Sequence, residues 1–191
     1  MRGNMQRPKA GAAAIKGEAM PDLYLFYVGG NAGKSNIEVH DIQFVVAESV
    51  EVAIPHLQAT WFGDPDKLHL DGYQIVRWVG GYDVQLSRER STAAEKLYFV
   101  NVGGYSPHTL AELHEFGLFV APDAAGAKQQ ALATLLVGSV QQHKDNLKEV
   151  DNQLLLDQLQ GYHIHLQPNP AGQLDPILWQ GYRPIGVTKG A

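Results

Sequence analysis

The chain has 191 residues, of which 45% are hydrophobic and 18% are charged, so it can form one compact domain or two small fused lobes. Its net charge of -5, with only 15 Lys and Arg residues, argues against a nucleic-acid partner, because such partners are bound by a basic face. The chain has no cysteine, which excludes disulfides, thiolate metal sites and a cysteine nucleophile. No apolar run reaches the length of a membrane span or a signal-peptide core, so we expect a cytoplasmic protein without a membrane partner.

Residues 1–22 are expected to form a flexible N-terminal tail. They are rich in Ala, Gly and basic residues, and their longest apolar run is Ala12–Ile15. Met5 and Met20 are alternative start positions. The folded part is therefore expected to begin near Leu23.

An internal duplication follows this tail. Residues 23–71 align with residues 97–145 at a constant offset of 74 without a gap, and 14 of the 49 aligned positions are identical, against roughly three expected from average composition. Further along, residues 81–86 match residues 161–166 at an offset of 80. The second copy is therefore expected to have gained six residues between its third and fourth strands.

Each copy opens with a predicted buried strand, Leu23–Val28 in the first and Leu97–Val102 in the second. Both runs are aliphatic and aromatic, and both end in a Gly-Gly pair, at residues 29–30 and 103–104. The glycines predict a turn with positive φ after each strand.

The next stretch of each copy alternates in polarity as a second strand does, over residues 38–47 and 112–121. In the first copy one face of this strand carries Glu38, His40, Ile42, Phe44 and Val46. A carboxylate and an imidazole are therefore expected at the start of the core-facing row.

A helix is predicted next in each copy. Ser49 and Asp123 are suitable N-caps, and the segments behind them, 50–62 and 124–136, have apolar residues at helical spacing. Pro55 is expected to kink the first of these helices. After a polar link, residues 68–79 alternate as a third strand, and residues 81–86 and 161–166 predict a fourth. Residues 144–160 suit either a strand or a helix, because their leucines and valine also recur at helical spacing.

These elements predict an α+β fold of two tandem ββαββ units, with a mixed or antiparallel sheet and helices on one face. The units are expected at residues 23–90 and 97–166, related by a pseudo-twofold axis. Residues 167–191 are expected to form a C-terminal extension that packs on the repeats.

The loop after the first strand resembles a phosphate-binding loop, since Gly33-Lys34-Ser35 follows a predicted strand. A phosphate-binding loop requires a helix immediately afterwards, whereas here the next segment alternates as a strand. The second copy has Pro107-His108-Thr109 in the same place. We therefore predict a strand-turn-strand connection without nucleotide binding.

A repeated set of histidines and carboxylates is the stronger candidate for chemistry. Imidazole and carboxylate ligate Zn, Mn, Fe or Ni, and residues two apart on a strand lie on one side of it. The predicted metal-ligating residues are Glu38, His40, His69 and Asp71 in the first copy, and Glu112, His114, His143 and Asp145 in the second.

Two other interpretations of this set stay open. Each histidine could be oriented by a carboxylate inside its unit as a purely structural pair, or the groups could perform acid-base catalysis without a metal. His56, His108, His163 and His165 have no histidine at the matching position of the other copy and are expected on surfaces or strand faces.

The residues Glu38, His40, Asp41, Phe44, Trp61, His69 and Asp71 resemble the pattern of a bacterial family, domain of unknown function 1543. The resemblance covers the first copy and implies that the second is its diverged partner, with Glu115 in place of the Asp and Leu135 in place of the Trp. It implies no activity, so catalytic residues and enzyme status stay undetermined. We expect a domain that binds a small ligand or a divalent metal. The alternative is a non-catalytic interaction or scaffold module, and homo-oligomer formation is left open.

Overall fold

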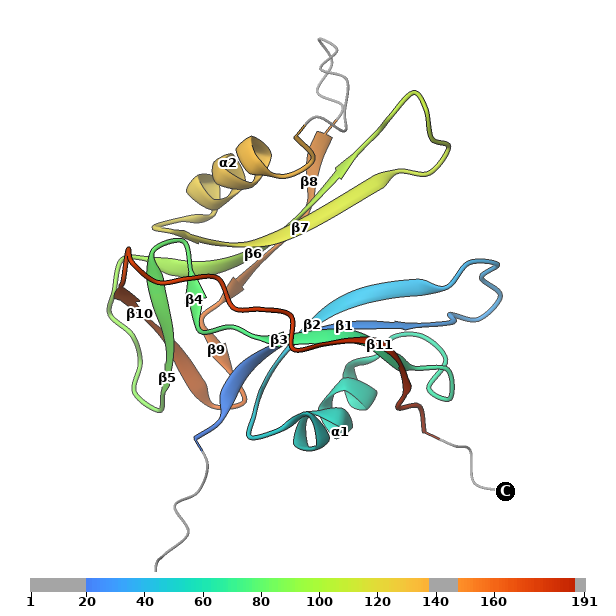
Figure 1. Cartoon of the computed structure of the whole chain (residues 1–191), viewed down its shortest axis with the longest axis horizontal. Coiled ribbons are helices and arrows are strands. Elements are labelled where there is room, and N and C mark those ends of the chain that lie inside the picture. The colour runs from blue at the N-terminus through green and yellow to red at the C-terminus, as the bar shows by residue number, and fades with distance from the viewer. Residues whose placement is uncertain (1–19, 138–147, 188–191) are drawn as a thin grey trace, which may run out of the picture.

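The computed structural model describes residues 20–137 and 148–187, with side chains described from residue 153 onward in the second range. The described fold is mostly β with two helices, and all its strand pairings are antiparallel. The strands form three small sheets. Two of the sheets form arms that are separated at their tips, and the third joins the arms at the base (Figure 1). In these residues no helix is long and apolar enough to cross a membrane.

The first arm is a four-stranded sheet with one helix on its outer face (Figure 1). In spatial order its strands are β11 (Trp179–Pro184), β3 (His69–Ile75), β1 (Asp22–Gly30) and β2 (Val39–Ala47), and its helix is α1 (Val50–Thr60). The helix begins at Ser49, whose Oγ accepts a hydrogen bond from the Val52 backbone N–H at 3.3 Å, as an N-cap requires.

The second arm repeats this arrangement with three strands. Their spatial order is β7 (Leu113–Ala121), β6 (Lys96–Gly104) and β8 (Lys148–Leu156), and α2 (Ala124–Thr134) covers the outer face. Asp123 caps α2 by accepting a hydrogen bond from the Gly126 N–H at 2.8 Å. Both predicted N-caps are therefore confirmed.

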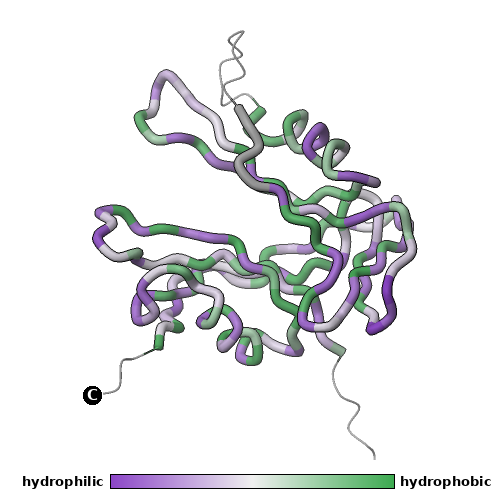
Figure 2. The backbone as a smooth tube through the Cα atoms, turned by 180° about the vertical axis from the view of Figure 1, so that it is seen from behind, coloured by the Kyte–Doolittle hydropathy of each residue, from purple (hydrophilic) through white to green (hydrophobic). Residues whose placement is uncertain are grey.

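A third sheet joins the arms at their base, and it takes strands from both halves of the sequence. Its order is β4 (Trp78–Val79), β5 (Tyr82–Ser87), β10 (Tyr162–Pro168) and β9 (Gln158–Leu159). Because β5 pairs with β10, the two halves share backbone hydrogen bonds and form one body. From behind, the two hairpin arms are again separate at their tips and joined at the base (Figure 2).

The hydrophobic core lies in three layers that follow the alternation of β1 and β6. Tyr24 and Phe26 face α1, whereas Leu23 and Leu25 face the inner side and pack with Phe99 and other residues of the second arm. Because β1 is buried on both faces, its sequence is a continuous apolar run. The inner row of β1 continues from Leu25 to Tyr27, beyond the packed base and into the space between the arms.

Two predictions about the backbone are corrected by the structure, and the strand-turn-strand connection predicted around Lys34 is confirmed. Gly29 and Gly30 do not form a turn: they are the last residues of β1, and the positive φ of 56° in this loop belongs to Gly33. Lys34 lies in a hairpin loop that leads into β2, without the helix of a phosphate-binding loop. Residues 148–156 form the strand β8, so the helical alternative for residues 144–160 is wrong over that range.

The position of the six-residue insertion is also corrected. Gly29 pairs with His69, and the matching Gly103 pairs with Glu149, so the offset has already become 80 at the third long strand. The extra residues therefore precede β8, and the gapless alignment at offset 74 holds only through β1, β2 and α1.

Candidate functional site

Three adjacent strands bring two histidines to one face of the first sheet. Gly29 of β1 pairs with His40 of β2 on one side and with His69 of β3 on the other. Neighbouring strands lie about 4.8 Å apart, so the two histidine backbones flank the glycine in a row. Both side chains can then lean toward each other above it.

Gly29 is needed because the histidine and carboxylate side chains occupy the space above its Cα. A Cβ at this position would lie 2.6 Å from His69 Nε2, 2.8 Å from Asp71 Oδ2 and 2.8 Å from His40 Cδ2. Real Cβ atoms do not approach other atoms this closely. The first glycine of the repeated Gly-Gly pair is therefore part of the site, for reasons of space and not of backbone conformation.

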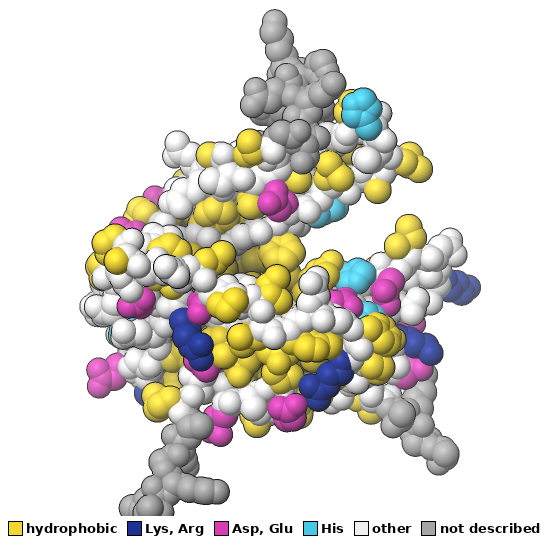
Figure 3. Space-filling model, in the orientation of Figure 1, with side chains coloured by type: hydrophobic (Ala, Val, Ile, Leu, Met, Phe, Trp, Pro, Cys, Tyr) yellow, Lys and Arg dark blue, Asp and Glu magenta, His cyan; other side chains and the backbone are white. Residues whose placement is uncertain are grey.

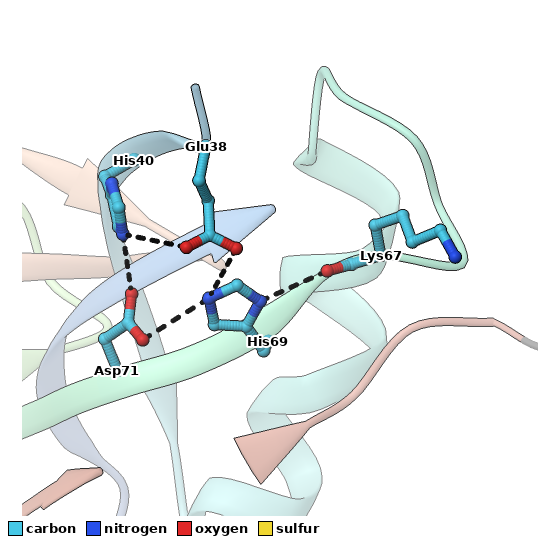
Figure 4. Close-up of polar contacts among 5 residues, drawn as sticks. All are labelled: Glu38, His40, Lys67, His69 and Asp71. Atoms are coloured by element: carbon cyan, nitrogen blue, oxygen red, sulfur yellow. Dashed lines mark hydrogen bonds and ion pairs between the residues drawn. The ribbon is translucent and has the colours of Figure 1, made fainter. Parts of the chain in front are cut away.

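The side chains of Glu38, His40, His69 and Asp71 converge on one another (Figure 4), and three of them reach the space above Gly29. His40 Nε2 lies 3.1 Å from Asp71 Oδ2 and 3.9 Å from Glu38 Oε2. His69 Nε2 lies 3.3 Å from Asp71 Oδ1 and 3.4 Å from Glu38 Oε1. The structure thus brings together the four residues predicted for the first copy, and Glu38, His40 and His69 each place a ligand atom within 4.8 Å of the others.

A backbone contact fixes the orientation of the His69 ring. Its Nδ1 lies 3.2 Å from the carbonyl oxygen of Lys67, which can only accept, so Nδ1 carries the proton in the neutral ring. The Nε2 lone pair then points toward Glu38 and Asp71. His69 is 1% exposed, so water cannot readily satisfy this atom.

The close contacts in the cluster do not have hydrogen-bond geometry. His69 Nε2 and Asp71 Oδ2 are both buried atoms without a hydrogen-bond partner. Two carboxylate oxygens nevertheless lie within 3.4 Å of His69 Nε2, and His40 Nε2 lies 3.1 Å from Asp71 Oδ2. Atoms that surround a common centre behave in this way, because each points at the centre and not at its neighbour. Ligand atoms on adjacent corners around an ion with bonds of about 2.1 Å lie about 3.0–3.4 Å apart, which matches three of the four contacts.

Aromatic rings enclose the two imidazoles. Tyr27 stacks on His40 with ring centroids 5.1 Å apart and planes 13° from parallel, and Tyr182 of β11 lies 4.5 Å from the His69 ring. Burial, and then the Asp71 charge, raise the pKa of Tyr27, so its phenol stays neutral at physiological pH. Tyr182, Gly29 and the Lys67 carbonyl were missed by sequence reasoning, and only Gly29 carried a signal, as part of a repeated pair.

The second arm reproduces only part of this arrangement. His114 Nε2 lies 3.7 Å from Glu112 Oε2 at the start of β7, and His114 pairs with Gly103 as His40 does with Gly29. At the position of His69 the register places Glu149. His143 and Asp145, predicted as ligands, lie outside the described residues.

The remaining histidines lie elsewhere, and His163 is a residue of β10 that pairs with Ser87 of β5. His56 Nε2 lies 3.1 Å from the Gln160 amide, and His165 Nε2 lies 2.8 Å from the Glu89 carbonyl. His108 is on the exposed loop between β6 and β7. None of these contacts joins the cluster above Gly29.

The four residues of the candidate site lie in a segment that matches a known protein family. A family model, Domain of Unknown Function (DUF1543), matches residues 35–86 and 109–166, more than half of the chain, in two tandem segments. The chain belongs to this family. The crystal structure of a protein Il1583 from Idiomarina loihiensis is similar, with 33% sequence identity and a TM-score of 0.67 over 86% of this chain and 98% of that one. No curated protein matches the chain, and the DUF1543 assignment carries no known function.

Proposed function

We propose that this DUF1543 protein binds a divalent transition-metal ion above Gly29, with His40 and His69 as nitrogen ligands and Glu38 and Asp71 as oxygen ligands. The observation that carries the proposal is the buried His69 Nε2. Its lone pair is directed by the Lys67 carbonyl toward two carboxylates, and it has no hydrogen-bond donor.

The charges of the cluster favour a cation of charge two. Two of the four groups are carboxylates, and a divalent cation placed between lone pairs that face one another would balance their negative charge. Histidine ligands usually donate their other ring N–H to a backbone carbonyl or carboxylate, as His69 does with Lys67. The mixed nitrogen and oxygen donors suit Zn, Mn or Fe better than Ca or Mg.

A difference between the two halves at the position of His69 supports this proposal. We infer that they descend from one ββαββ unit and are related by a pseudo-twofold axis. If the cluster were a device that each unit needs to fold, the same groups would recur at the same register positions. Glu149 stands where His69 does, so the two-histidine row belongs to the first half alone.

Metal content tests the proposal directly. Full-length protein is purified without added metal, and separate samples are equilibrated with one equivalent of Zn, Mn or Fe(II). The metal bound in each sample is then measured by mass spectrometry. We expect about one ion per chain. His40→Ala and Glu38→Gln should each lower that content sharply, and both positions are partly exposed, so the variants should fold.

His114→Ala is the matched control, because it removes the histidine at the same register position of the other arm. It should leave the metal content unchanged. Wild-type protein without bound metal under all three conditions would contradict the proposal. Loss of stability without loss of metal in His40→Ala would favour the alternative, a scaffold module in which the four groups only hold β1, β2 and β3 together.

A further inference from the structure

An open cleft lies between the two arms beside the candidate metal site. Its cavity volume is about 410 Å³, and residues of both arms line it: Tyr27, His40, Asp41, Asn101, His114 and Phe116. Figure 3 shows the opening between the arms, with histidine and acidic side chains along it. The closed base of the cleft is the shared apolar core around Phe99.

Two aromatic rings from opposite arms remain uncovered in this cleft. Tyr27 of β1 is 38% exposed and Phe116 of β7 is 39% exposed, although their ring centroids are only 6.1 Å apart. A smaller cavity of about 230 Å³ also has Tyr27 and Phe116 in its wall and reaches Asp71. Apolar rings left open inside a concave surface are typical of ligand sites.

The rings lie next to the candidate metal site. His40 lines the larger cavity and Asp71 the smaller one, and Tyr27 stacks on His40. A molecule that covers the rings of Tyr27 and Phe116 therefore has one end at His40 and Asp71 of the candidate metal site. The Tyr27 O–H is a hydrogen-bond donor in the same wall of the cleft.

We propose that the cleft binds a small molecule with one aromatic ring and a metal-binding oxygen group, with the ring against Tyr27 and Phe116 and the oxygen group on the metal. This inference rests on the proposed metal site. A volume of about 410 Å³ lies at the low end of small-molecule sites, roughly 300–1,000 Å³, and suits a single ring. The ring faces supply stacking, and the metal fixes the orientation.

A pair of probes with the same chelating group separates the ring from the metal. Full-length protein loaded with Co²⁺ is titrated with benzohydroxamate and with acetohydroxamate, and the visible spectrum of the ion reports binding. We expect benzohydroxamate to bind about tenfold more tightly or better, because its ring covers apolar surface that the methyl group leaves exposed. Phe116→Ala should remove this preference and leave the affinity for acetohydroxamate unchanged.

Two further variants complete the experiment. Phe116→Leu keeps an apolar side chain without a ring face and should lower the preference by a smaller factor, while Leu110→Ala, at a fully exposed position of the same arm, should leave it intact. Equal affinity for both probes in the wild type, or an unchanged preference in Phe116→Ala, would overturn the cleft proposal and leave the metal site standing. A protein that gives no Co²⁺ spectrum would instead refute the metal site itself, and the cleft proposal with it.

Discussion

The two arms of the molecule share a scaffold but carry different groups at matching positions. In the first arm the row across three strands is His40, Gly29, His69. In the second arm it is His114, Gly103, Glu149. The N-caps, the paired glycine and the register irregularity beside it recur in both arms, whereas the second histidine does not.

The arms also differ in what covers the third strand. β11 pairs with β3 and brings Tyr182 onto the His69 ring, and no described strand pairs with the outer edge of β8. The backbone features that recur in both arms are those needed for folding, and the Glu-x-His pair also recurs, as His40 with Glu38 and His114 with Glu112. Features found in one arm are better candidates for function, and the five predictions below test this distinction.

The largest expected effect concerns the packing of the two arms. Phe26 and Val100 occupy matching positions, and both are fully buried against the helix of their arm. Phe26→Ala should lower the free energy of unfolding by about 3–5 kcal/mol, and Val100→Ala by about 2 kcal/mol, because it removes less buried surface. Urea denaturation measures both. Equal losses of unfolding free energy would mean that the two arms are packed equally well, although the core of the second arm has fewer aromatic residues.

Metal-linked stability should be confined to the first arm. A ligand at one hundred times its Kd stabilises the folded state by about 2.7 kcal/mol, which for a chain of this size raises Tm by roughly 5–10 °C. We expect Zn²⁺ to produce this rise in the wild type and in Glu112→Gln, but not in Glu38→Gln. Differential scanning fluorimetry at increasing Zn²⁺ reports it. A rise that depends on Glu112 and not on Glu38 would place the metal in the other arm.

The space above Gly29 gives a third prediction. Gly29→Ala places a methyl group on His69 Nε2 and Asp71 Oδ2, so it should cost about 1–3 kcal/mol by overpacking and weaken metal binding in the same variant. Gly33→Ala is the control for backbone conformation, because Gly33 has positive φ and open space around its Cα. It should lower stability while leaving metal affinity unchanged. Intact metal binding in Gly29→Ala would show that the four ligands do not meet above this residue.

Local patterns in the sequence predicted the helices, their caps and the first two strands of each half, because these depend on residues close together in the chain. The convergence of Glu38 with His40, and of His69 with Asp71, followed from their spacing along a strand. That the two pairs meet depends on β1 lying between β2 and β3, which no spacing in the chain specifies. The arrangement became visible only in the three-dimensional structure.

The second half shows why the rest of the site could not be predicted. The match of His69 with His143 requires no gap in the sequence alignment. Strand register, however, is fixed by hydrogen bonds to β6, and these place Glu149 opposite Gly103. Tyr182 reaches His69 from a strand more than a hundred residues away along the chain. Such a contact has no local signal, since one tyrosine in a terminal segment resembles any other.

The helix caps should contribute equally in the two arms. Ser49→Ala and Asp123→Ala each remove the side-chain acceptor of one backbone N–H, and each should cost about 1 kcal/mol. Neither change should alter metal binding, because both caps lie at the outer helices. Thermal unfolding measures the loss. Ser49→Asp keeps a side-chain acceptor at the cap, so this variant should be as stable as the wild type. A cap whose removal costs nothing would indicate that water satisfies the helix end equally well.

The smallest expected effect is an alkaline loss of stability that both arms share. Burial is the largest cause that raises the pKa of Tyr24 and of Tyr98, which occupy matching positions, and nearby carboxylates raise it further. In the unfolded chain a tyrosine ionises near pH 10, while in the folded protein it keeps its proton to higher pH. Above about pH 10 the unfolded state therefore binds fewer protons than the folded state, and the stability falls as pH rises. Tyr24→Phe and Tyr98→Phe should each make this fall shallower without changing its position, as measured by urea denaturation between pH 8 and pH 11. A change in only one of the two variants would show that the arms differ in their packing around this ring, and not only in their site residues.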